Sequence, residues 1–207
     1  MKPYCFEDTL EVGIDEVARG SLIGDVYAAA VILPQEISFT VNDSKKLSKR
    51  KRLILKDCIE EEAIDFSVAN IDNNIIDEIN ILNATIKAMH HAISGLNVEP
   101  EYIIVDGNQF KPYYNEKGTF IPHHCIIDGD AIFNSIASAS ILAKVYHDKY
   151  IEKLCDDYPE LDEYYGLRSN MGYGTQQHLK GIKEHGVTQF HRKSYKTAKN
   201  QKNIIIS

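Results

Sequence analysis

Apolar residues along this chain form short continuous runs and longer runs with a helical period. The short runs cover Glu11–Asp15, Val26–Leu33, Phe66–Ile71, Tyr102–Asp106 and Pro122–Asp128. Continuous apolar runs of this length are typical of strands that are buried in a sheet. The longer runs predict helices from a cap at Ser48 to about Ala63, over Asp72–Gly95, from about Ile132 to Cys155 and from about Thr175 to His185. We therefore predict an α/β chain, with a loop after Pro159.

Acidic residues stand at the ends of three of the predicted strands. Asp15 and Glu16 follow the first strand, Asp106 closes the run Tyr102–Asp106, and Asp130 follows the last run. Strand ends of an α/β protein converge on one edge of the sheet, where such proteins place their ligands. Carboxylate oxygens are the ligands that Mg²⁺ and Mn²⁺ prefer. From the residues alone, a solvated turn or a helix cap remains an open alternative for each acid.

Composition describes an ordinary globular protein. The chain has 207 residues, which suffices for one domain with its own core, and 43% of them are hydrophobic. No stretch approaches the length of a membrane span, and the N-terminus lacks the apolar region of a signal peptide. Four cysteines are widely spaced without a Cys-x-x-Cys pair, so we expect reduced thiols in a cytoplasmic protein.

Basic residues are concentrated in two places although the net charge is −7. Six of them lie between Lys45 and Arg52, and others follow Arg192 toward the C-terminus. A local basic stripe on an acidic protein favours contact with phosphates while limiting non-specific coating of nucleic acid. Simple solvation of a helix is the alternative for the first cluster. We expect the basic segment 196–207 to be a loosely ordered tail after a domain that covers residues 1–195.

Seven ordered blocks of the sequence together resemble the ribonuclease HII family, the type 2 ribonucleases H. The resemblance covers Val12 to about Tyr195, and its blocks are Gly13-Ile14-Asp15-Glu16 with Arg19-Gly20, Asn42–Ser48, Asp77–Leu82, Ile104–Asn108, Gly129-Asp130 with Ser138–Val145, Gly172–Thr175 and His191–Ser194. It implies a ribonuclease H-like fold, a mixed twisted sheet flanked by helices with a helical C-terminal extension. It also implies an endoribonuclease that cleaves the RNA strand of RNA–DNA hybrids and incises 5′ of single ribonucleotides in duplex DNA.

The resemblance also implies roles for particular residues. Asp15, Glu16, Asp106 and Asp130 are expected to be catalytic and to hold two divalent ions, Mn²⁺ or Mg²⁺. The residues expected to bind substrate are Ala18, Arg19, Gly20, Lys45, Lys46, Lys144, Tyr173 and Arg192. In the family a Gly-Arg-Gly turn and a tyrosine read the ribose 2′-OH, which distinguishes RNA from DNA. Ser138 and Ser140 could position the backbone, although packing of small residues is the reading that we favour.

Three positions depart from the family pattern. Alanine replaces the first glycine of the reading turn at Ala18, Asp25 stands where proline is usual, and Met171 replaces a usual lysine. A positive φ at Ala18 would make its methyl group cost about 1 kcal/mol. A catalytically weakened protein that binds RNA–DNA hybrids, or another two-metal nuclease of the same fold, is the alternative function. We expect no membrane association, no obligate protein partner and a monomer.

Overall fold

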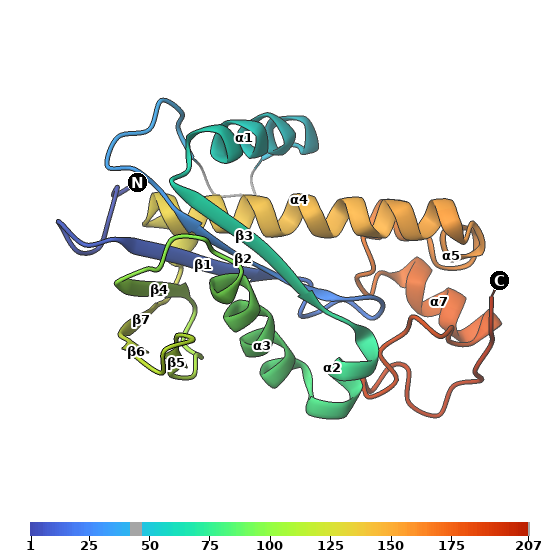
Figure 1. The fold of residues 1–207 in the computed structure, drawn as a ribbon. Helices are drawn as coiled ribbons and strands as arrows, with labels where there is room; N and C mark the ends of the chain where they lie inside the picture. Colours follow the sequence, from blue (N-terminus) through green and yellow to red (C-terminus); the bar gives the residue numbers. More distant parts are fainter. Residues whose placement is uncertain (42–46, 207) are drawn as a thin grey trace. The chain divides into compact units, whose positions relative to one another are not determined.

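The computed structural model in Figure 1 describes residues 1–41 and 47–206. The chain divides into two compact units. The sheet unit comprises Met1–Val17, Tyr27–Asn70 and Ile86–Val145, and the helical unit comprises Ala18–Val26, Ile71–Thr85 and Tyr146–Ser207.

A five-stranded mixed sheet organises the sheet unit. Its strand order is β3-β2-β1-β4-β7. The strands are β1 (Glu11–Val17), β2 (Val26–Ile32), β3 (Asp65–Ile71), β4 (Tyr102–Asp106) and β7 (His123–Ile126). β1 pairs antiparallel with β2 and parallel with β4, and β4 pairs parallel with β7. The sequence predicts each of these strands, and the mixed sheet with its helices confirms the predicted fold class.

Helices cover the sheet. α1 (Lys49–Glu62) and the first part of α4 (Asn134–Asp157) pack on β2, where Ala29 and Val31 share a buried cluster with Ile59 and Ala137. α3 (Ile81–Ser94) lies on the other side of the sheet (Figure 1). A Cβ atom added to Gly13 in β1 would collide with the backbone of Ser135 and Ile136. Glycine at this position therefore lets α4 approach the central strand closely.

The helical unit contains α2 (Asn73–Ile79), α5 (Glu160–Tyr165), α6 (Leu167–Asn170), α7 (Gln176–His185) and the second part of α4. Its core joins apolar residues of α4, α5, α6 and α7 to those of the 18–26 segment, including Ile23, Tyr165 and Ile182. α7 lies where the sequence predicts a helix, from about Thr175 to His185. Thr175 caps it by accepting a hydrogen bond from the backbone of His178, and Gly186 follows its end. This unit contains the predicted helical C-terminal extension.

Three local predictions were wrong. The expected helix over Asp72–Gly95 is two helices, because Asn80 has a φ of 67° and interrupts the hydrogen-bond ladder between α2 and α3. The expected loop after Pro159 contains the short helices α5 and α6, joined at Gly166, whose φ is also 67°. A hairpin of β5 (Tyr113–Tyr114) and β6 (Phe120–Ile121) was missed, because two-residue strands carry no readable period.

The C-terminal segment makes defined contacts with the rest of the helical unit. Ala198 and Ile206 are buried in its core. The backbone of Val187 donates to Lys202 at 2.8 Å and accepts from Ile204 at 2.9 Å. The division at residue 195 stays a prediction. Within residues 1–41 and 47–206, no helix is both long enough and apolar enough to cross a membrane.

Candidate active site

The pairing of β1 with β4 brings two of the predicted acids to neighbouring strand positions. Ile14 pairs with Val105 in this parallel ladder, and Asp15 and Asp106 are the next residues on the two strands. Glu16 follows Asp15 in β1. Three of the four predicted acids therefore stand on adjacent strands at one end of their ladder.

Asp15 is buried, with 5% of its surface exposed. Its carboxylate accepts hydrogen bonds from the backbone N–H of Glu16, at 2.7 Å, and from the hydroxyl of Ser140 on α4. Burial raises the pKa of Asp15 well above its usual value of 3.8, and the negative charges of Glu16 and Asp106 raise it further. Ser140 is therefore more than the small packing residue that we favoured from the sequence.

The backbone of Asp130 contacts the carboxylate of Asp106. Asp130 belongs to the short 3₁₀ helix Gly129–Ala131, it is buried, and its N–H donates to Asp106 Oδ1 at 3.4 Å. A Cβ atom added to Gly129 would lie 3.4 Å from the same carboxylate oxygen. It would lie only 2.7 Å from Ile136 Cδ1, so glycine here allows close packing against α4.

The chemistry of these acids fits a hard divalent cation. Among the residues that the structure describes, no three His, Cys, Asp or Glu side chains already form a group that could hold a metal. Asp15, Glu16 and Asp106 nevertheless offer only oxygen donors, and their mutual repulsion is what a divalent cation would relieve. The residues present therefore fit such an ion.

The predicted reading turn and Tyr173 lie side by side in the helical unit. A Cβ atom added to Gly20 would lie 3.7 Å from the Tyr173 ring. Ser21 forms a bridge with Tyr173, and the N–H of Leu22 donates to the carbonyl of Gly172 at 2.8 Å. Two blocks that are far apart in the sequence are thus joined by backbone hydrogen bonds. Arg19 in the turn is exposed.

Ala18 has the positive φ that the sequence left undecided. Its φ is 71°, in the left-handed region that favours glycine, and the residue is buried. Met171 also has a positive φ, of 50°, and packs against the apolar core of the helical unit. Asp25 is buried, and its carboxylate accepts a hydrogen bond from the Tyr150 hydroxyl at 3.1 Å.

Arg192 does not occupy the position that we expected for a phosphate contact. Its side chain is fully buried, and its guanidinium donates to the carbonyls of Ala18, Arg19, Gly24 and Asp25 at 2.7–3.2 Å. A guanidinium that is used in this way cannot face a phosphate in solvent. Instead it holds the backbone of the 18–25 segment.

The remaining predicted substrate residues are described only in part. Lys144 lies on α4 in the sheet unit and is half-buried. Lys45 and Lys46 lie outside the described residues. No role was predicted for the buried His178 and His191, and His191 enters the sequence argument only through the block His191–Ser194. Their hydrogen bonds join parts of the chain that are not neighbours in sequence.

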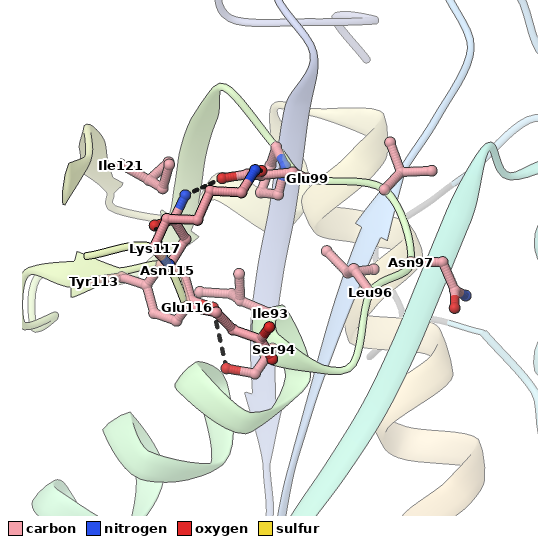
Figure 2. Close-up of a pocket in the computed structure, with 12 residues that line it drawn as sticks. Ile93, Ser94, Leu96, Asn97, Glu99, Tyr113, Asn115, Glu116, Lys117 and Ile121 are labelled. Atoms are coloured by element: carbon pink, nitrogen blue, oxygen red, sulfur yellow. Dashed lines mark hydrogen bonds and ion pairs between the residues drawn. The ribbon is translucent and has the colours of Figure 1, made fainter. Parts of the chain in front are cut away.

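A cavity of about 280 Å³ lies elsewhere in the sheet unit. It is lined by the end of α3, the loop after it and the β5–β6 hairpin (Figure 2). The hydroxyls of Ser94 and Tyr113 are hydrogen-bonded at 3.0 Å, and Glu99 pairs with Lys117 at 3.3 Å. None of the predicted site residues lines this cavity, so it is not the candidate active site.

Comparison with known proteins gives consistent matches over nearly the whole chain. A family model described as Ribonuclease HII matches residues 12–198. A ribonuclease HII of Christiangramia forsetii is 51% identical over 193 residues, which are 93% of each chain. The crystal structure of ribonuclease H2 from Pyrococcus horikoshii OT3 is similar in fold, with a TM-score of 0.71 at 24% identity over 91% of this chain and 94% of that one. Bst-RNase HIII in complex with Mn²⁺ has a TM-score of 0.63 at 20% identity, covering 91% of this chain and 67% of that one.

Asp15→Asn is expected to stabilise the metal-free protein at neutral pH. Because the folded-state pKa of Asp15 is raised, the folded protein binds this proton more tightly than the unfolded chain, and stability falls as pH rises above 3.8. In EDTA at pH 7 the variant should melt roughly 3 °C or more above wild type. The gap should shrink toward pH 4 and also when Mn²⁺ is added to wild type. Asp128→Asn, the same change at an exposed position, is the control. A variant that melts below wild type in EDTA at pH 7 would contradict the repulsion.

Ala18→Gly is expected to leave the free energy of unfolding unchanged or to raise it by up to about 1 kcal/mol, because glycine adopts a positive φ without strain. Ala28→Gly is the matched control, since Ala28 is equally buried but lies in the regular strand β2. That change should lower the free energy of unfolding by about 1 kcal/mol or more. Urea denaturation of the two variants measures the difference, and equal losses would show that the left-handed φ carries no strain.

Proposed function

The chain belongs to the ribonuclease HII family and is therefore a hydrolase of the ribonuclease H type. We propose that it cleaves the RNA strand of RNA–DNA hybrids and incises DNA duplexes on the 5′ side of embedded ribonucleotides. The products would carry a 3′-OH and a 5′-phosphate. The observation that carries the proposal is the grouping of Asp15 with Glu16 and Asp106. A protein that only bound hybrids would have no need to keep these mutually repelling carboxylates.

Asp15, Glu16, Asp106 and Asp130 would hold two divalent ions, Mn²⁺ or Mg²⁺. Bound there, the ions would lower the pKa of the attacking water and stabilise the departing 3′ oxygen. The acids would act as ligands and not as nucleophiles. The Ser140 hydroxyl and the Glu16 N–H both donate to Asp15, so they would orient its carboxylate toward a cation.

Selection of RNA would rest on the ribose 2′-OH, which both donates and accepts a hydrogen bond. Ala18, Arg19 and Gly20 would read it through backbone groups, and the ring of Tyr173 would lie against the sugar. The bridge between Ser21 and Tyr173, and the Tyr173 ring lying next to Gly20, support this pairing of turn and ring. Lys144, Lys45 and Lys46 remain the proposed phosphate contacts. Arg192 would support recognition indirectly, since its guanidinium holds the carbonyls of the turn.

We place this activity in the cytoplasm, where the four unpaired cysteines would stay reduced. The proposed substrates are RNA–DNA hybrids and duplex DNA that contains ribonucleotides. The protein would act as a monomer without an obligate protein partner. The net charge of −7 would limit non-specific binding to DNA.

A DNA duplex with one ribonucleotide tests the proposed reaction directly. With Mg²⁺ or Mn²⁺, the strand should be cut once, 5′ of the ribonucleotide, and the fragment ends can be identified by ligation and by gel mobility. An all-DNA duplex of the same sequence is the control. Equal cutting of the control, or full activity in excess EDTA, would refute the proposal, and binding without cutting would favour the hybrid-binding alternative.

Asp106→Asn should abolish turnover while leaving substrate binding nearly unchanged. The change keeps the shape of the side chain and removes a charge that would hold metal. Loss of several kcal/mol of transition-state stabilisation should lower kcat by about 10³-fold or more. Gel-shift titration and single-turnover cleavage at saturating Mg²⁺ measure the two effects. Retention of more than about a tenth of the wild-type rate would remove Asp106 from the ligand set.

A further inference from the structure

A chain of buried hydrogen bonds in the helical unit ends at the backbone of Tyr173. His178 Nδ1 lies 3.1 Å from the Tyr173 carbonyl oxygen, and its Nε2 lies 3.2 Å from His191 Nε2. His191 Nδ1 accepts from the backbone N–H of Thr188 at 3.0 Å. Both imidazoles are fully buried. These contacts, from Thr188 through His191 and His178 to Tyr173, are called the imidazole relay below.

The relay has one consistent set of proton positions. A backbone N–H can only donate, so His191 Nδ1 carries no proton and His191 Nε2 must carry one. That proton is donated to His178 Nε2, which therefore accepts. His178 must then carry its proton on Nδ1, where it is donated to the Tyr173 carbonyl. The direction of every hydrogen bond in the relay is thus fixed by Thr188.

A second proton on either ring would break the relay, because it would turn two N–H groups toward each other. Burial disfavours this protonation. It lowers the pKa of His178 to about 4 and, with the neighbouring His178, lowers the pKa of His191 to about 3. Both rings therefore stay neutral at the pH values where a nuclease of this kind would work.

The segment that carries His191 is itself held by α2. The side-chain amide of Asn73 donates to the carbonyl of Gln189 at 3.0 Å, and Asp77 accepts from the backbone N–H groups of Lys193 and Ser194 at 2.8 and 2.9 Å. Arg192, the residue after His191, donates to the carbonyls of Ala18 and Arg19. His191 is thus linked to Tyr173 through His178, and its neighbour Arg192 contacts the Ala18-Arg19-Gly20 turn directly.

We propose that His178 and His191 are positioning residues, which hold Tyr173 at the distance from the Ala18-Arg19-Gly20 turn that recognition of a single ribose 2′-OH requires. This inference rests on the proposed function, because the relay has this role only if the turn and Tyr173 bind the ribose and its 2′-OH. The Tyr173 N–H donates to Asn170 at 3.0 Å, and its carbonyl also accepts from Thr175 at 2.8 Å. Leu22 links the neighbouring Gly172 to Arg192 through backbone hydrogen bonds, and the relay adds a second link, from the Tyr173 carbonyl to His191.

Two substitutions at His178 separate the two ends of the relay. Asparagine places an N–H donor close to the position of Nδ1, so His178→Asn keeps the hydrogen bond to Tyr173 and loses the one to His191. Glutamine places its amide close to Nε2, so His178→Gln keeps the contact with His191 and releases Tyr173. His185→Asn is the control, since His185 lies on the same helix but stacks on Tyr164 at 4.0 Å, outside the relay.

The readout is kcat on a duplex with one ribonucleotide, compared with kcat on a continuous RNA–DNA hybrid, together with the melting temperature. A continuous RNA strand offers a 2′-OH at every register, so a displaced ring still meets one, whereas the single ribonucleotide offers only one. His178→Gln should lose about tenfold or more in the ratio of the two rates, and His178→Asn less than about threefold. His185→Asn should leave the ratio unchanged.

A ratio that is the same in wild type, His178→Asn and His178→Gln would overturn the inference, even if both variants melt lower. Equal losses in the two His178 variants would overturn it as well. Failure of wild type itself to cut the single-ribonucleotide duplex would refute the proposed function instead, so the two failures are distinguishable. Imidazole ¹H–¹⁵N correlation spectra of the wild-type chain provide a second measurement. They should show the Nδ1–H tautomer for His178 and the Nε2–H tautomer for His191, and any other pair of tautomers would contradict the relay.

Discussion

The parallel pairing of β1 with β4 is the contact on which the candidate active site depends. It makes Asp15 and Asp106 neighbours although 90 residues of sequence lie between them. Gly13 in the same strand lets α4 approach closely, and α4 carries the Ser140 hydroxyl that hydrogen-bonds Asp15. The negative charges of Asp15, Glu16 and Asp106 repel one another, and this repulsion would be smaller if the carboxylates were separate and solvated. A cation bound as we propose would make the arrangement favourable.

In the helical unit, buried polar side chains fix the position of the backbone. Arg192 is charged and fully buried, and its cost of desolvation is offset by donation to the carbonyls of the 18–25 segment. His178 and His191 avoid that cost by remaining neutral, and each nitrogen has a partner. Satisfied polar networks of this kind fix one geometry, whereas apolar packing tolerates small shifts. If the turn distinguishes one hydroxyl group, as we propose, it needs such a fixed geometry.

Ala18 shows how a family pattern and a local backbone requirement interact. The family uses glycine at this position, and the structure gives Ala18 a φ of 71°, which glycine adopts without strain. The Ala18 carbonyl accepts from both Arg192 and the N–H of Ser21, and these contacts hold the residue in its strained conformation. The surroundings of Ala18 therefore hold alanine in a backbone conformation that favours glycine.

The sequence by itself determined the sheet strands and the helices α1 and α7, and it singled out the four acids as candidates. These features rest on local patterns, namely continuous apolar runs, helical periods, Ser48 as a cap, and a carboxylate after a strand. Only the tertiary structure decided the break at Asn80, the burial of Arg192 and the pairing of His178 with His191. Each of these depends on which distant backbone groups surround a residue, and no local period carries that information. Arginine looks the same in sequence whether it faces a phosphate or four buried carbonyls, so the fold alone assigns its role.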